Sequence, residues 1–143
     1  MITEQKLKKM SEDDYMNHGQ LEFFRHRLQQ MKSELVESIE LARSSLVDNE
    51  VSSDMSDIAT KQEMQQLHLR TVERQSKLLR KVDEAIERTK TGEYGYCEET
   101  GEPIGILRLL ARPTATLSIQ AKEAQEYKER TEGEGETEES DVE

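Results

Sequence analysis

The sequence lacks tryptophan, has one cysteine and two prolines among its 143 residues, and contains only 4% aromatic residues. One cysteine excludes an intrachain disulfide, and so few aromatic residues limit the size of any core. No apolar run is long enough to cross a membrane, and the N-terminal residues lack the apolar stretch of a secretory signal. We therefore expect a cytoplasmic protein without membrane contact, and the scarcity of proline allows long uninterrupted helices.

Charge dominates the composition, with 36% charged residues, 33% apolar residues and a net charge of -11. This balance suits an elongated helical protein with a thin apolar seam better than a globular enzyme. Proteins that bind duplex nucleic acid use basic surfaces, so the acidity argues against DNA as the main ligand. Much of the acidity comes from residues 131–143, which carry seven acidic residues and no basic one, and we expect a disordered tail there.

Two long segments show helical periodicity. In the first, Asn17–Val47, Asn17 and Gln20 match a capping box, and apolar residues recur at spacings of three and four. This stripe is typical of a packing seam; it consists of Leu21, Phe24, Leu28, Met31, Leu35, Ile39, Ala42 and Leu46. The second segment, Asp57–Thr91, has a weaker stripe of Ile58, Met64, Leu67, Val72, Leu78, Leu79, Val82, Ala85 and Ile86.

Together the two segments predict a mainly α fold built on an antiparallel coiled-coil hairpin, about 45–50 Å long at 1.5 Å per residue. The hairpin occupies residues 17–91 and follows a short N-terminal segment, 1–16. Polar residues in the middle of the second helix leave a basic ladder of Arg70, Arg74 and Lys77, with Lys81 beyond. A solvated helix face is the alternative interpretation of this ladder.

The turn of the hairpin, residues 48–59, is acidic. Asp54 and Asp57 are three residues apart at a helix start, where carboxylates satisfy free amides and complement the helix dipole. Capping alone explains both residues. The other hypothesis is functional, since carboxylates at an exposed tip can perturb a metal ion or a basic cluster in a partner.

Residues 92–130 differ from the hairpin. Four glycines fall close together among apolar residues, which predicts a compact knuckle packed by Tyr94, Tyr96, Ile104, Leu107 and Leu109. A final helix is expected from Thr116 to Arg130, with Leu117, Ala121, Ala124 and Tyr127 facing inward. The whole sequence shows no nucleophile motif, glycine-rich phosphate loop or His-carboxylate constellation, so we expect no enzyme activity.

A structural zinc site needs four ligands, usually as two closely spaced pairs. Cys97 begins one such pair, but Thr100, Ser118 and Ala121 stand at the other three positions. We therefore expect a knuckle without zinc. No cation lies near Cys97 in the sequence to lower its pKa, which favours an inert thiol.

Three stretches resemble the DksA/TraR family of bacterial transcription regulators. They are Tyr15-Met16-Asn17, Asp54-x-x-Asp57-x-Ala59, and Gly95-Tyr96-Cys97 followed by Ile104-Gly105-Ile106-x-Arg108-Leu109-x-Ala111-Arg112-Pro113-Thr114. The resemblance implies a regulator that binds RNA polymerase rather than DNA and inserts its hairpin into the secondary channel. Such regulators destabilise open complexes, repress ribosomal RNA promoters and activate some amino-acid biosynthesis promoters. The family works with the alarmone ppGpp.

The resemblance also implies residue roles. Asp54, Asp57 and Ala59 would act near the polymerase active site, and Arg70, Arg74 and Lys77 would dock on the polymerase rim. The ppGpp contacts would be Leu78, Lys81, Arg112 and Lys122. The family's fuller members carry four cysteines, so this chain resembles a cysteine-poor variant; ppGpp would be its co-regulator, with no required cofactor. We expect a monomer, and two other functions remain open: a structural coiled-coil adaptor and a secondary-channel factor for transcript cleavage.

Overall fold

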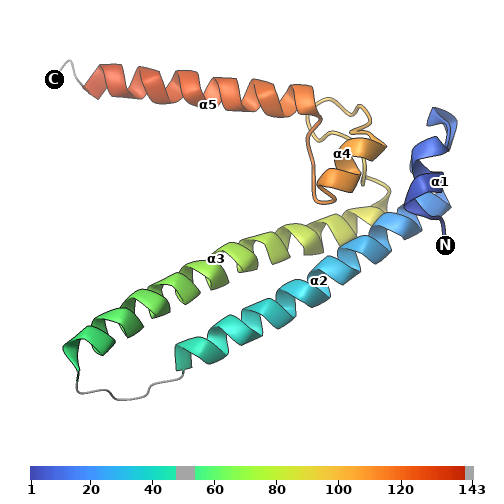
Figure 1. The fold of residues 1–143 in the computed structure, drawn as a ribbon. Coiled ribbons are helices and arrows are strands. Elements are labelled where there is room, and N and C mark those ends of the chain that lie inside the picture. The colour runs from blue at the N-terminus through green and yellow to red at the C-terminus, as the bar shows by residue number, and fades with distance from the viewer. Residues whose placement is uncertain (48–53, 141–143) are drawn as a thin grey trace.

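A computed structural model of the protein describes residues 1–47 and 54–140, with side chains for residues 1–46 and 54–133. In these residues the chain forms a 3-10 turn (Glu12–Asp14) and the helices α1 (Glu4–Lys9), α2 (His18–Val47), α3 (Met55–Thr91), α4 (Ile106–Ala111) and α5 (Ile119–Ser140). The α2 and α3 helices form the long antiparallel hairpin, while α1, α4 and the start of α5 gather at its base (Figure 1). The predicted mainly α fold is confirmed.

The first long helix begins where the sequence predicted. The Asn17 Oδ1 atom accepts a hydrogen bond from the Gln20 amide at 2.9 Å, which satisfies one of the free amides at the helix start. The Gln20 side chain reaches back and accepts from the amide of Met16 at 2.8 Å. In a standard capping box this side chain would accept from the amide of the N-cap residue, here Asn17. In this protein it accepts from the residue before the N-cap instead.

The predicted stripe of α2 faces α3. Phe24, Leu28, Ile39 and Ala42 are buried, and the other four stripe residues are half-buried. Val82 and Ala85 of α3 are buried opposite them. At about 25 cal/mol per Å² of apolar surface, burial along this seam is the main force that holds the two helices together.

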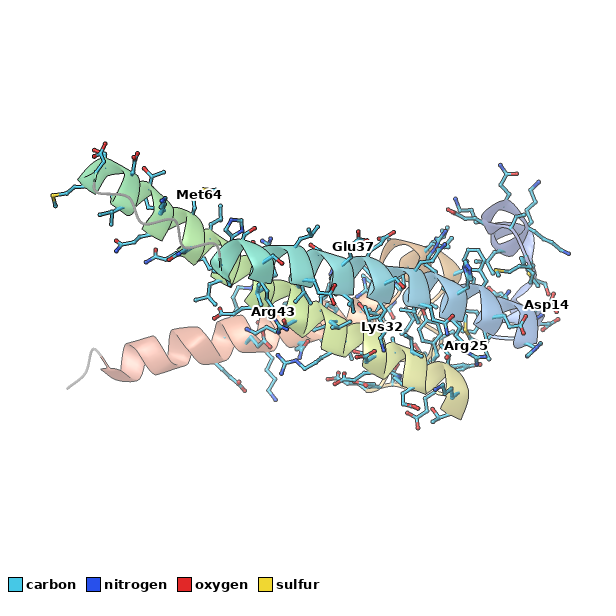
Figure 2. All side chains as sticks on the ribbon, turned by 90° about the horizontal axis from the view of Figure 1, so that it is seen from below. Asp14, Arg25, Lys32, Glu37, Arg43 and Met64 are labelled. Atoms are coloured by element: carbon cyan, nitrogen blue, oxygen red, sulfur yellow. The ribbon has the colours of Figure 1, made fainter. Side chains whose placement is uncertain are left out.

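The outer part of α3 departs from the prediction. Three pairs fix the antiparallel register: Arg25 with Thr89, Lys32 with Asp83, and Ser38 with Gln75. Continuing this register places the end of α2 opposite residues 66–67, so α3 extends about three turns beyond α2 (Figure 1). Met64, Leu67 and Ile58 are therefore exposed rather than packed in a seam, and Figure 2 shows Met64 on this outer part.

The knuckle packs on the base of the hairpin. Tyr94 is 2% exposed; its ring lies 5.6 Å from that of Phe24, and its hydroxyl donates to the Pro113 carbonyl at 2.6 Å. Ile104 and Leu109 are buried as predicted, and Tyr96 is half-buried. Leu107 is 72% exposed, so its predicted packing role is wrong: it lies on the outer face of the short helix α4.

The last helix differs most from expectation. It runs from Ile119 to Ser140, beyond the predicted end at Arg130, and so replaces the expected irregular tail over residues 131–140. Glutamate is a good helix former, and single glycines such as Gly133 weaken a helix without ending it. Ala121 is buried and Leu117 half-buried, but Ala124 and Tyr127 are exposed, so the prediction that they face inward is wrong. No helix in the described ranges is long and apolar enough to span a membrane.

Candidate functional site

The tip of α3 carries the predicted acidic residues. Asp54 is the N-cap of α3, and its carboxylate accepts a hydrogen bond from the Ser56 amide at 2.9 Å. Asp57 lies in the first turn, and both side chains are exposed, as is Ala59. The capping interpretation of Asp54 is thus confirmed. Capping is compatible with a role at the tip, because a carboxylate can accept more than one hydrogen bond. Residues 48–53 of the predicted tip lie outside the described residues.

The basic ladder forms one stripe along α3. Arg70, Arg74 and Lys77 follow one another at spacings of four and three, which place them on a single helix face, and all three are exposed. With Lys81, Leu78 and Glu73 they line a shallow groove. The lining therefore contains four cations and one carboxylate, so its field favours an acidic partner.

A second cavity, of about 270 Å³, lies at the base of the hairpin, and three separate elements contribute cations to it. Lys81 comes from α3, Arg112 follows the end of α4, and Lys122 lies near the start of α5. The structure thus brings together three of the four residues that were expected to contact ppGpp. Leu78 lies in the neighbouring groove, which shares Lys81 with this cavity.

Arg108 also lines this cavity, and reasoning from the sequence did not select it as a site residue. Its Nε atom donates to the Leu117 carbonyl at 2.9 Å, and its own carbonyl accepts from the Arg112 amide at 2.7 Å. The cavity therefore holds four cations against two carboxylates, Glu84 and Glu98. The spacing of four between Arg108 and Arg112 was the available signal, since it places both at the same edge of one short helix.

Hydrogen bonds and an ion pair fix the knuckle to the base of the hairpin. Arg88 at the end of α3 pairs with Glu98 at 3.1 Å and donates to the carbonyls of Glu93 and Tyr96, which joins the hairpin to the knuckle. The Tyr15 hydroxyl donates to the Gly95 carbonyl at 2.6 Å and accepts from the Gly105 amide at 2.9 Å. The knuckle is therefore fixed to the segment before α2 as well as to α3.

The four positions of the degenerate zinc site lie together in the knuckle. Cys97, Ser118 and Ala121 are buried, and Thr100 lies in the turn that the Gly101 amide closes by donating to the Cys97 carbonyl at 2.9 Å. The Ser118 hydroxyl accepts from the Ala121 amide at 3.1 Å, so it caps the start of α5 instead of binding a metal. One sulfur, two hydroxyls and a methyl group do not fit the ligand set of structural zinc. Among the described residues, no cluster of three or more His, Cys, Asp or Glu side chains could hold a metal ion.

The environment of Cys97 differs from the expected one. Burial raises the pKa of its thiol, but hydrogen bonds from the Thr100 side chain and from the amides of Ser118, Thr100 and Glu99 outweigh burial and lower the pKa to about 6. The sequence showed no cation that would lower this pKa, and in the structure hydrogen bonds lower it instead. At 3% exposure the sulfur is nevertheless shielded from solvent.

These features define a class of protein. In the part of the chain that the structure describes, the polar side chains form exposed ladders, an open basic cavity and a protruding tip rather than an enclosed constellation of nucleophile and base, which is the organisation of a binding protein. Comparison with known proteins identifies the family. Residues 20–89 match the N-terminal domain of "DnaK suppressor protein DksA", and residues 92–127 match the "Prokaryotic dksA/traR C4-type zinc finger".

Individual relatives agree. A protein of Caulobacter vibrioides named "RNA polymerase-binding transcription factor DksA" is 48% identical over 122 residues, which cover 84% of this chain and 86% of the relative. The Escherichia coli K12 protein of the same name is 34% identical over 119 residues, with 82% and 79% covered. Among solved structures, the transcription factor DksA2 from Pseudomonas aeruginosa superposes with a TM-score of 0.81 at 50% identity and covers 90% of this chain and 99% of its own.

The chain belongs to the DksA family of transcription factors, which are not enzymes. It matches the family's zinc-finger region with a single cysteine, as a variant without the four-cysteine metal site.

Proposed function

We propose that this protein binds bacterial RNA polymerase directly and regulates transcription initiation from the secondary channel. The hairpin enters the channel, the tip residues Asp54, Asp57 and Ala59 act near the active site, and open complexes lose stability. Ribosomal RNA promoters are repressed and some amino-acid biosynthesis promoters are activated. The protein acts in the cytoplasm as a monomer, without contacting DNA by sequence. Membership of a family whose relatives are named as polymerase-binding factors supports this proposal.

The geometry of the hairpin supports the same proposal. A helix of 37 residues is about 55 Å long, and its outer three turns extend beyond α2 as a narrow probe. The basic ladder of Arg70, Arg74 and Lys77 lies further back on α3, where the rim of a channel would meet the hairpin. Ladder and tip are thus separated along one rigid helix, so docking at one end sets how far the other end reaches.

One observation carries the role of ppGpp: Lys81, Arg112 and Lys122 converge on one open cavity. Cations from three elements can surround a pyrophosphate group, and charge-assisted hydrogen bonds to phosphate contribute about 1.5–3 kcal/mol each. Leu78, beside Lys81, supplies an apolar edge. Because the cavity is open to solvent, we propose that ppGpp binds between this surface and the polymerase.

The test is the lifetime of the open complex on a ribosomal RNA promoter, measured with purified polymerase and this protein, with and without ppGpp. We expect the protein to shorten the open-complex lifetime and ppGpp to shorten it further. Lys81→Ala removes most of the ppGpp increment, whereas Lys90→Ala, an exposed lysine near the end of the same helix, leaves it intact. An increment that survives Lys81→Ala would refute the assigned ppGpp cavity.

A structural adaptor is the second candidate, because capping explains Asp54 without any partner. Asp54→Asn separates the two candidates, since asparagine caps a helix about as well as aspartate but carries no charge. An adaptor keeps its function in this variant. A transcript-cleavage factor would instead accelerate cleavage in backtracked complexes, which our proposal does not predict.

A further inference from the structure

The basic ladder has two candidate acidic partners: a polymerase surface and the C-terminal segment of this chain. The groove on α3 combines Arg70, Arg74, Lys77 and Lys81 with a single carboxylate, Glu73. Residues 131–143 carry seven acidic residues and no basic one. Each surface is strongly charged, of opposite sign, and exposed over its described part.

The course of α5 brings these two surfaces to the same side of the molecule. Lys122, near the start of α5, and Lys81, toward the C-terminal end of α3, line one cavity, so α5 begins beside the base of the hairpin. From there α5 extends toward the same end of the molecule as the tip, opposite in chain direction to α3, and the two helices diverge along the way (Figure 1). Every residue from Glu126 to Gly133 is exposed, so this part of α5 is not packed against the body.

Helix geometry sets the register between them. Lys81 and Arg70 are separated by 11 residues of α3, about 16 Å, and Lys122 and Glu132 by ten residues of α5, about 15 Å. Measured along each helix, the acidic segment therefore begins about as far from the shared cavity as the outer end of the basic ladder does. A fully extended chain from Gly133 to Glu143 spans up to about 36 Å, more than twice the length of the ladder.

Gly133 supplies a weak point at which the chain can turn. A Cβ atom added there would meet no atom within 4 Å, so packing does not require glycine at this position. Glycine in an exposed helix costs about 1 kcal/mol relative to alanine, which lowers the free energy needed to unwind the last turns.

We propose that residues 131–143 dock on the groove formed by Arg70, Arg74, Lys77 and Lys81 in the free protein, and that they compete there with the polymerase. The competition rests on the polymerase-binding function proposed above; the intramolecular contact does not. Tethering gives the segment a local concentration in the millimolar range, so a weak contact is sufficient. The contact is ionic and exposed, and salt therefore weakens it.

The first experiment uses the full-length protein without polymerase. Backbone amide shifts of residues 70–81 are compared between the native chain and the triple variant Glu136→Gln, Glu138→Gln, Glu139→Gln, at about 20 mM and about 0.5 M salt. The control removes the same number of charges from the exposed face of α2, by Glu34→Gln, Glu37→Gln and Glu40→Gln. We expect the tail variant alone to shift these amides, at low salt only. Shifts confined to the walls of the Lys122 cavity, or no shift at low salt, would overturn the proposal.

The second experiment measures polymerase binding by the same three proteins. The tail variant binds about threefold to tenfold more tightly at low salt, as expected for a few exposed ion pairs released from competition, and the α2 control does not. Equal affinities of the native and tail-variant proteins would overturn the competition. If none of the three binds polymerase, the proposed function fails, and the amide shifts still decide the intramolecular contact.

Discussion

Arg25 of α2 closes the end of α3 by donating two hydrogen bonds to Thr89, from Nε to the hydroxyl and from Nη2 to the backbone carbonyl, both at 3.1 Å. The last carbonyls of a helix have no partner within the helix, and Thr89 is buried, so water does not easily replace the guanidinium. The pair therefore fixes the base of the hairpin, from which the register of the whole seam follows.

The first prediction concerns this pair. Arg25→Ala lowers the free energy of unfolding by about 1–3 kcal/mol, because it leaves a buried carbonyl without a donor. Urea unfolding of Arg25→Ala, Thr89→Ala and the double variant gives their coupling, which we expect at about 1 kcal/mol or more. Additive effects would show that the two residues do not act together.

Tyr15 joins the N-terminal segment to the knuckle through a single oxygen that donates to Gly95 and accepts from Gly105. Tyr15→Phe removes both hydrogen bonds with little change of shape, and we expect a loss of about 1–3 kcal/mol in unfolding free energy. Tyr127→Phe is the matched control, since Tyr127 is 69% exposed. Equal stability of the two variants would contradict the role of Tyr15.

The Cys97 thiol predicts a dependence of stability on pH. Hydrogen bonds lower its pKa from about 9 to about 6 in the folded protein, so the fold favours the thiolate. A group with a depressed pKa stabilises the fold above its unfolded pKa and loses that contribution as pH falls toward its folded pKa. The free energy of unfolding of the native protein, relative to that of Cys97→Ser, should therefore rise as the pH increases from about 6 to about 9. A constant difference, measured by urea unfolding across this range, would refute the assignment.

The stability of the knuckle should not depend on zinc in the native protein, but it should do so once the missing cysteine ligands are introduced. Cys97 is buried beside Thr100 and Ser118, whose groups donate hydrogen bonds to its sulfur, and Ala121 lies one turn into α5. The native protein should keep its melting temperature in the presence of a zinc chelator. Thr100→Cys, Ser118→Cys and Ala121→Cys together create four thiol ligands, and the melting temperature of this variant should fall when zinc is removed. A chelator that lowers the melting temperature of the native protein would contradict this account.

The sequence predicted those features that follow from local periodicity and capping. The seam residues Phe24, Leu28 and Ile39 lie on one helix face whatever the partner, and Asn17 and Asp54 cap helices through neighbouring amides. The degenerate zinc positions could also be read directly, because they depend on residue identity alone.

Features that depend on distant contacts could not be predicted in this way. The exposure of Met64 follows from the unequal lengths of α2 and α3, and that of Leu107 from the orientation of a six-residue helix. Arg108 joins the basic cavity only because α4 packs at the base of the hairpin. The lowered pKa of Cys97 comes from amides whose directions are set by the folded knuckle.

The central claim is that the tip acts on the polymerase rather than merely ending a helix, and the open-complex lifetime with Asp57→Asn tests it most directly. Glu63→Gln, which removes a charge from an exposed position further along the same outer part of α3, is the control. We predict that Asp57→Asn binds polymerase like the native protein but no longer shortens the lifetime on a ribosomal RNA promoter, while Glu63→Gln still does. A lifetime shortened equally by the native protein and Asp57→Asn would contradict the account.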